Sequence, residues 1–161
     1  METEGGPEGG DASRRVGAFT SDPGLRITSV HAEALAHQIH VFLDRLLAEG
    51  HGFVILGVDE TVAPADNRFV QAGTRTGSEL LAECVGTPYT SYRPEEIDEI
   101  LSLGWFAPDP DERIGNFTSY WEPPVAEEAA ALMALTLLQV HDLRRPDDLR
   151  IRAGRFDGAR G

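Results

Sequence analysis

The chain has 161 residues, 41% of them hydrophobic, and a formal net charge of -13. Its length and apolar content support one domain around one core. Strong negative charge disfavours phosphate backbones and anionic lipid as partners, so we expect neither nucleic acid nor membrane binding. It favours neutral or basic protein partners, unless acidity serves solubility alone. Cys84 is the only cysteine, which excludes an internal disulfide.

The two ends of the chain have the composition of tails. Residues 1–24 are rich in Gly, Glu, Asp and Ser, and residues 153–161 are again rich in Gly. Such segments bury too little apolar surface to offset their ordering entropy, so we expect disordered tails around one domain, residues 25–152. The first tail has no apolar signal-peptide core, and no apolar run approaches the roughly 20 residues of a bilayer span. We therefore expect a cytoplasmic protein.

The first predicted helix covers residues 29–49, with Ser29 as its N-cap and Gly50 as its C-cap. Apolar residues recur there at intervals of four, three and four, which is the pattern of an amphipathic helix. They are Leu35, Ile39, Phe42 and Leu46.

Three strands should follow as an antiparallel meander, because the segments that connect them are short. The continuous apolar run 53–58 predicts a strand covered on both faces. A second strand begins at Phe69, and a turn at Gly77 pairs it with a third strand over 80–85. Cys84 alternates with apolar residues on that strand, which favours a buried small hydrophobe over a reactive thiol.

The second half of the chain adds helices and a strand. Pro94 opens a short helix that Gly104 ends, and the aromatic segment 116–121 predicts a strand. A long helix over 125–143 follows, and 149–152 predicts a short final strand. The order is helix, three strands, helix, strand, helix. This α-β-β-β-α-β-α order predicts an α+β fold with an antiparallel sheet flanked by helices.

Candidate metal ligands lie on the first helix. His37, His40 and Asp44 share one helical face, with Glu33 one turn earlier. The same residues form the polar side of the amphipathic helix, and no HExxH motif or cysteine accompanies them. GxSxG, P-loop and GxGxxG motifs are also absent. We therefore expect no metal, no cofactor and no catalytic residue.

Four carboxylates cluster on the short helix that Pro94 opens. They are Glu95, Glu96, Asp98 and Glu99. Acid–base catalysis needs carboxylates in a water-poor pocket, and this pattern indicates a solvated helix face instead.

Aromatic residues are dense between positions 89 and 121. Core packing is the simplest reading for the group, but Tyr and Trp are also enriched at interface hot spots. Trp105, Phe106, Tyr120 and Trp121 are the candidates to face a partner.

Several segments carry a resemblance to a known family. They are Arg68-Phe69-Val70-Gln71, residues 79–85, residues 94–105 with their Leu-Gly-Trp corner, Asn116-Phe117 and the long C-terminal helix. Over about residues 29–151 the chain resembles the Tir/YbjN-like chaperone group, the TY-Chap domains of actinobacterial proteins. That group is similar in fold to type III secretion chaperones. The resemblance implies a scaffold for a protein client, often a homodimer, and supplies no catalytic residue.

The leading hypothesis is therefore a non-enzymatic, chaperone-like domain that docks a protein client on its sheet face or on an exposed strand edge. The alternative is a regulatory or sensory module that binds a small ligand under the C-terminal helix. An enzyme ranks third, because it would need polar groups that converge only in three dimensions.

Overall fold

The computed structural model describes residues 25–58, 67–111 and 115–155. Its elements in chain order are α1 (Ala32–Glu49), β1 (Gly52–Val58), β2 (Phe69–Thr74), β3 (Leu80–Cys84), α2 (Pro94–Leu103), β4 (Phe117–Trp121), α3 (Ala126–Gln139), a short 3-10 turn (Pro146–Asp148) and β5 (Leu149–Gly154). The strands form one antiparallel sheet in the order β4-β3-β2-β1-β5. The α+β class and the predicted order of elements are confirmed.

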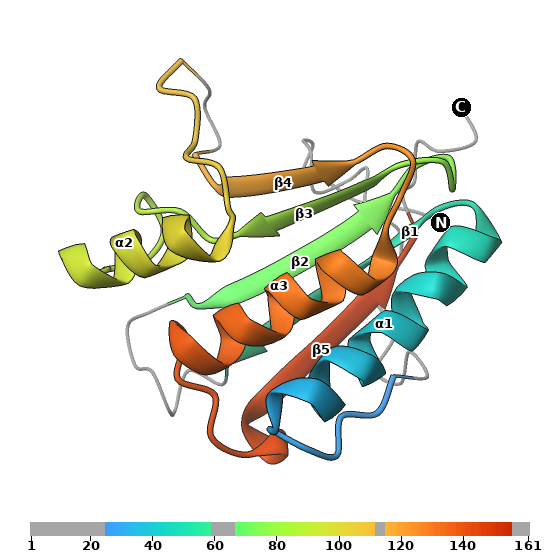
Figure 1. Ribbon diagram of the computed structural model, residues 1–161, viewed down its shortest axis with the longest axis horizontal. Coiled ribbons are helices and arrows are strands. Elements are labelled where there is room, and N and C mark those ends of the chain that lie inside the picture. The colour runs from blue at the N-terminus through green and yellow to red at the C-terminus, as the bar shows by residue number, and fades with distance from the viewer. Residues whose placement is uncertain (1–24, 59–66, 112–114, 156–161) are drawn as a thin grey trace, which may run out of the picture.

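Helices α1 and α3 lie side by side across one face of the sheet, and α2 lies at one end of it (Figure 1). Side chains alternate between the two faces of a strand, so every second strand residue meets these helices. The fully buried residues of this helical face include Val54, Leu56, Val70, Leu80 and Ala82 from the strands and Leu35, Ile39, Leu43, Met133 and Leu137 from the helices. Apolar burial between the sheet and the two helices is therefore the main source of stability.

The opposite face, called the open face below, has no described helix over it (Figure 1). On β1 the expectation of cover on both faces holds fully for the helical side and in part for the open face, where Phe53 is buried and Ile55 is half-buried.

Two helix ends differ from the sequence prediction. Helix α1 begins at Ala32, and the Ser29 hydroxyl accepts a hydrogen bond from the His31 N–H instead of capping the helix. Helix α3 ends at Gln139, because the chain turns at Asp142, whose φ is 61°. The side chain of His141, the residue before Asp142, is buried.

The turn between β2 and β3 is held by one carboxylate. Glu79 accepts hydrogen bonds from the Thr74 and Thr76 hydroxyls at 2.8 and 2.9 Å, and from nearby main-chain N–H groups. Burial raises the pKa of Glu79, but these hydrogen bonds outweigh it and the net pKa is lowered. Gly77 has φ 86°, and a Cβ there would meet the Leu47 carbonyl oxygen at 2.9 Å, so the turn requires glycine.

The domain limits can be compared with the prediction only in part. β5 continues through Gly154, so residues 153 and 154 belong to a strand and not to a tail. The predicted tail of residues 1–24 and the last residues, 156–161, lie outside the described part of the chain.

Candidate partner-binding surface

The sheet ends at β4, where residues from a loop add one further pair. Phe106 and Thr118 bond each other twice through their main chains, at 2.9 and 3.1 Å. Directly paired residues point their side chains to the same face, so Phe106 joins Thr118 on the open face.

Three apolar side chains gather on the open face at this edge. Phe106 is 68% exposed and Tyr120 is 52% exposed, and Leu81 is exposed beside them. Leu81 is the direct cross-strand partner of Tyr120 on β3. On the other side of β4, Phe106 is the diagonal neighbour of Tyr120, at about 7 Å. We call these three residues the open-face patch. Large apolar residues that are exposed together, rather than singly, are typical of an interaction site.

Main-chain groups next to the patch point outward. The groups of Thr118 that bond Phe106 face away from β3. Strand groups alternate in direction with each residue, so Tyr120, two positions on, directs its N–H and C=O to the same outer side. No described residue pairs with these two groups of Tyr120. The edge can therefore accept an added strand.

The charge around the patch is negative. Glu83 is the direct cross-strand partner of Thr118 on the open face, two residues from Leu81 along β3, and accepts a hydrogen bond from Asn116 at 2.9 Å. Glu122 follows β4 and accepts a hydrogen bond from the Tyr120 hydroxyl at 3.1 Å. Neither β3 nor β4 contains an arginine or a lysine. An acidic segment would therefore be disfavoured here.

The four aromatic residues expected to face a partner do not converge. Phe106 and Tyr120 lie in the open-face patch. Trp105 is only 3% exposed, and its indole N–H donates to the Thr136 hydroxyl at 2.8 Å under α3, so it is a core residue. Trp121 points to the helical side, where it is half-buried and donates to Glu128 at 3.0 Å. Trp105 therefore lies in the core of this structure, with its side chain on the side opposite to that of the next residue, Phe106.

Sequence reasoning missed Leu81. The buried residues of β3 are Leu80, Ala82 and Cys84, so position 81 faces outward and would ordinarily be polar. An apolar residue at an outward-facing strand position is the sequence pattern that would have indicated Leu81 as part of an exposed apolar patch.

A buried ion pair ties α2 to the sheet. The Arg68 guanidinium bonds both carboxylate oxygens of Glu96, at 3.0 and 3.2 Å, and also donates to the Val140 and Ser91 carbonyl oxygens. The Glu96 side chain is only 12% exposed, so the expectation of a solvated carboxylate is wrong for this residue. Burial alone would raise the pKa of Glu96, but hydrogen bonds from Arg68 and Arg93 lower it to about 2.

Cys84 lies beside this pair in an environment that suppresses its reactivity. Its sulfur is 3.7 Å from the Tyr92 hydroxyl and 3.7 Å from His141 Nε2. Burial raises the pKa of the Cys84 thiol to about 12, and burial also raises the pKa of Tyr92. The thiol is therefore protonated at neutral pH, and its prediction as a buried small hydrophobe is confirmed.

The candidate metal ligands of α1 spread over its solvent side. His40 contacts Asp44 at 3.2 Å, and His37 is exposed. Among the described residues, no three His, Cys, Asp or Glu side chains come close enough to hold a metal ion. The described helices also include none that is both long enough and apolar enough to cross a bilayer.

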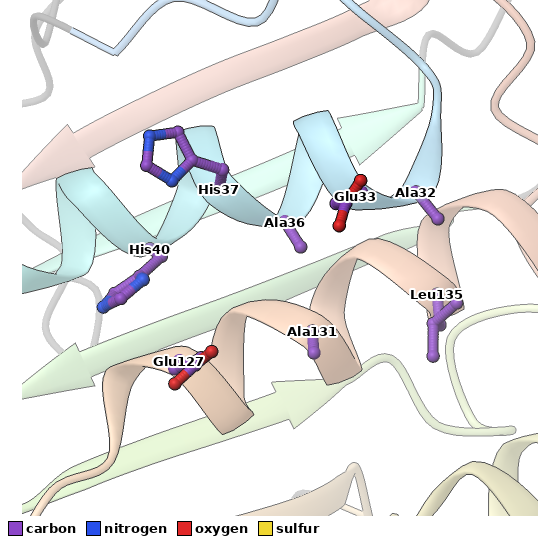
Figure 2. A pocket seen from close by; sticks show the side chains of 8 residues that line it. All are labelled: Ala32, Glu33, Ala36, His37, His40, Glu127, Ala131 and Leu135. Atoms are coloured by element: carbon purple, nitrogen blue, oxygen red, sulfur yellow. The ribbon is translucent and has the colours of Figure 1, made fainter.

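A groove runs along the solvent side of α1 and α3, with a volume of about 480 Å³ (Figure 2). It is lined by Ala32, Glu33, Ala36, His37 and His40 from α1 and by Glu127, Ala131 and Leu135 from α3. The two helices run antiparallel, since Ala32 lies near Leu135 and His40 near Glu127 (Figure 2). No strand residue lines the groove, so it lies beside α3 and not beneath it.

Searches of curated proteins and of solved structures found no match to this chain, whereas a comparison with protein families found one. That result is a family described as "T3SS (YopN, CesT) and YbjN peptide-binding chaperone 3", or TY-Chap3, which matches residues 29–155. The match runs from the segment before α1 to the end of β5. The resemblance seen in the sequence is thereby confirmed, and the chain belongs to the TY-Chap3 family of peptide-binding chaperone domains.

Proposed function

We propose that this domain is a non-enzymatic chaperone that holds an extended segment of a client protein along the free edge of β4. The observation that carries the proposal is that two features suited to peptide binding lie at the same position. The open-face patch and the outward N–H and C=O of Tyr120 occupy the same strand edge. Its family membership supports a peptide as the ligand.

The client segment would add to β4 as a sixth strand. Its main chain would bond Tyr120, and every second side chain would lie on the open face against Tyr120 and Leu81. Phe106 would close one end of the added strand, because its own pairing with Thr118 occupies the edge there. Main-chain bonds would supply affinity for many sequences, and the patch would select for alternating apolar residues.

The client segment would be neutral or basic between its apolar residues. Glu83 and Glu122 border the patch, and the whole chain carries a formal net charge of -13. Like charges placed side by side would oppose an acidic client. The same acidity would keep the complex with an apolar client soluble.

Homodimerisation in the cytoplasm is part of this proposal. A second copy could pair along the same β4 edge, and it would then compete with the client for Tyr120. Sedimentation equilibrium would give twice the chain mass of 17.5 kDa for a dimer. If the edge is shared in this way, a bound peptide would return the mass toward that of one chain.

A small-ligand module finds less support. The side of α3 that faces the sheet is filled by fully buried residues, among them Ala129, Met133 and Leu137. A ligand beneath α3 would have to displace this packed core.

The test is selection of peptides from a random phage-displayed library with the full-length chain. We expect selected peptides with alternating apolar residues and few acidic ones. Affinity should fall about tenfold in a Phe106→Ser/Tyr120→Ser variant, as is usual for the loss of central aromatic contacts.

Two controls make this result specific. A Tyr89→Ser variant removes an aromatic residue that is exposed outside the patch, and it should bind like the unmodified chain. Two versions of a selected peptide, each with one of the two alternate sets of main-chain nitrogens methylated, block opposite edges of the added strand. The version methylated on the edge that faces β4 should lose its affinity, and the version methylated on the outer edge should keep it. Failure to enrich any peptide, or equal binding to the double variant, would overturn the proposal.

A further inference from the structure

The groove between α1 and α3 is shaped by small side chains at matching positions. Ala32, Ala36 and His40 follow one another at intervals of four on α1, and Glu127, Ala131 and Leu135 do so on α3. Residues four apart on a helix form a ridge, and two ridges with alanines at their centres leave a channel between them. Ala36 and Ala131 are half-buried and line its middle from the two sides (Figure 2).

The rim of the groove is acidic. Glu33 and Glu127 are exposed along it, one on each helix. The two helices contain a single arginine, Arg45, which is not among the groove-lining residues. Its guanidinium lies over the ring of Phe42, 5.1 Å from the centroid. A partner with positive charge on both sides of an apolar strip would complement the groove.

We propose that this groove docks a basic amphipathic helix of another protein, as a second contact separate from the β4 edge. A helix is favoured over an extended peptide for a physical reason. The main-chain groups of α1 and α3 are bonded within their own helices and offer nothing to an extended main chain. A docked helix satisfies its own main-chain groups, and alanines at the contact let helix axes approach to about 8 Å.

The size of the groove sets the extent and strength of the contact. Each lining ridge spans nine residues from first to last, and the eight helical rises between its ends cover about 12 Å, which matches about two turns of a partner helix. Such a contact lies at the small end of specific interfaces, so we expect affinity in the micromolar range. Because the charges are exposed, the affinity should fall as salt is added.

The test uses a defined peptide as the probe. It has about 18 residues, enough for partial helicity in water, with Ala and Leu on one face and Lys flanking that face. Titrated at low salt into the ¹⁵N-labelled full-length chain, it should shift the amide signals of Ala36 and Ala131. The amide signal of Tyr120 on β4 should stay in place.

Three variants of the chain sharpen the test. Glu33→Gln/Glu127→Gln removes the rim charges and should weaken binding about fivefold, the effect of losing two exposed ion pairs. Ala131→Leu fills the channel with a good helix former and should weaken binding at least about tenfold. Glu95→Gln/Asp98→Asn removes two exposed charges from α2, outside the groove, and should leave the affinity unchanged.

Five outcomes would overturn the proposal. The probe could fail to bind, or it could shift only β4 signals. It could bind the Ala131→Leu variant as well as the unmodified chain. Equal binding by a version with central prolines, which cannot be helical, would show that a helix is not recognised. Shifts of Ala36 and Ala131 with protein concentration alone would assign the groove to a second copy of this chain. None of these outcomes would disprove peptide binding at the β4 edge, which is tested separately.

Discussion

The two faces of the sheet differ in which groups they bury and which they expose. On the helical face, even the charged groups of Arg68 and Glu96 are buried and bonded to each other. On the open face at β4, the apolar side chains of Phe106 and Tyr120 are exposed, and the Tyr120 main-chain groups have no described partner. The first arrangement stabilises the fold. The second contributes little to the stability of the isolated chain and leaves apolar side chains and main-chain groups available to a partner.

Neighbouring residues make the contrast sharp. Trp105 and Phe106 are adjacent, yet Trp105 bonds Thr136 in the core and Phe106 is largely solvent-exposed. Both are large aromatic residues, so composition does not separate them. Their different surroundings predict that substitutions on the helical face act on stability and those on the open face act on binding.

The largest effect should come from the buried ion pair. Replacing Arg68 with Ala leaves the Glu96 carboxylate buried without its main partner, which should cost about 3–5 kcal/mol in the free energy of unfolding. Urea unfolding followed by circular dichroism measures this loss. Arg93→Ala is the matched control, because Arg93 also contacts Glu96 but its side chain is 70% exposed, and it should cost no more than about 1 kcal/mol. Equal losses in the two variants would remove the distinction between buried and exposed arginine.

Acid should weaken the same region. The pKa of Glu96 is about 2 in the folded chain and 4.5 ordinarily. A lowered carboxyl pKa stabilises the fold above the unfolded-state value, and this stabilisation is lost as pH falls from about 4.5 to about 2. The loss should reach about 3 kcal/mol, measured by urea unfolding between those pH values. Glu96→Gln should flatten that part of the pH profile, and an unchanged profile would contradict the pairing.

A smaller effect is expected at Trp105. Trp105→Phe removes the indole N–H that bonds Thr136 and leaves a small void, which should cost about 2 kcal/mol. The Thr136 hydroxyl keeps its bond to the Leu132 carbonyl, and this limits the loss. Thermal unfolding measures it, and peptides selected against the unmodified chain should bind the folded variant normally. Weakened binding without lost stability would return Trp105 to the partner-facing set.

The smallest effect on stability should belong to the open-face patch. Phe106→Ser and Tyr120→Ser should each change the free energy of unfolding by no more than about 0.5 kcal/mol, because both side chains are mostly exposed. Isothermal titration with a selected peptide should show the affinity loss that thermal unfolding does not. A loss of stability comparable to that of Trp105→Phe would show that the patch supports the fold.

Periodicity was enough to predict most of the fold. The apolar intervals of α1 and the alternation in β3 depend on local spacing, so those elements were found. The end of α3 was placed too late, since the helix stops at Gln139 and is followed by a buried His141 and by Asp142 with a positive φ, which local spacing does not encode.

The candidate site was only half predictable for the same reason. Aromatic density indicated the segment that contains Phe106 and Tyr120, but density alone does not separate exposed aromatic residues from a buried one such as Trp105, because that depends on which side of the chain meets the helices. The Arg68–Glu96 pair joins residues 28 positions apart, and no sequence period links them.

Amide hydrogen exchange at Tyr120, with and without a selected peptide, tests directly whether clients add as a strand to β4. Nuclear magnetic resonance resolves this amide from that of Thr118, which already bonds Phe106 and serves as an internal control. If the client adds as a strand, the Tyr120 amide exchanges rapidly in the free chain and becomes strongly protected in the complex, while Thr118 changes little. If a peptide binds tightly and Tyr120 exchange is unaltered, strand addition at β4 is wrong.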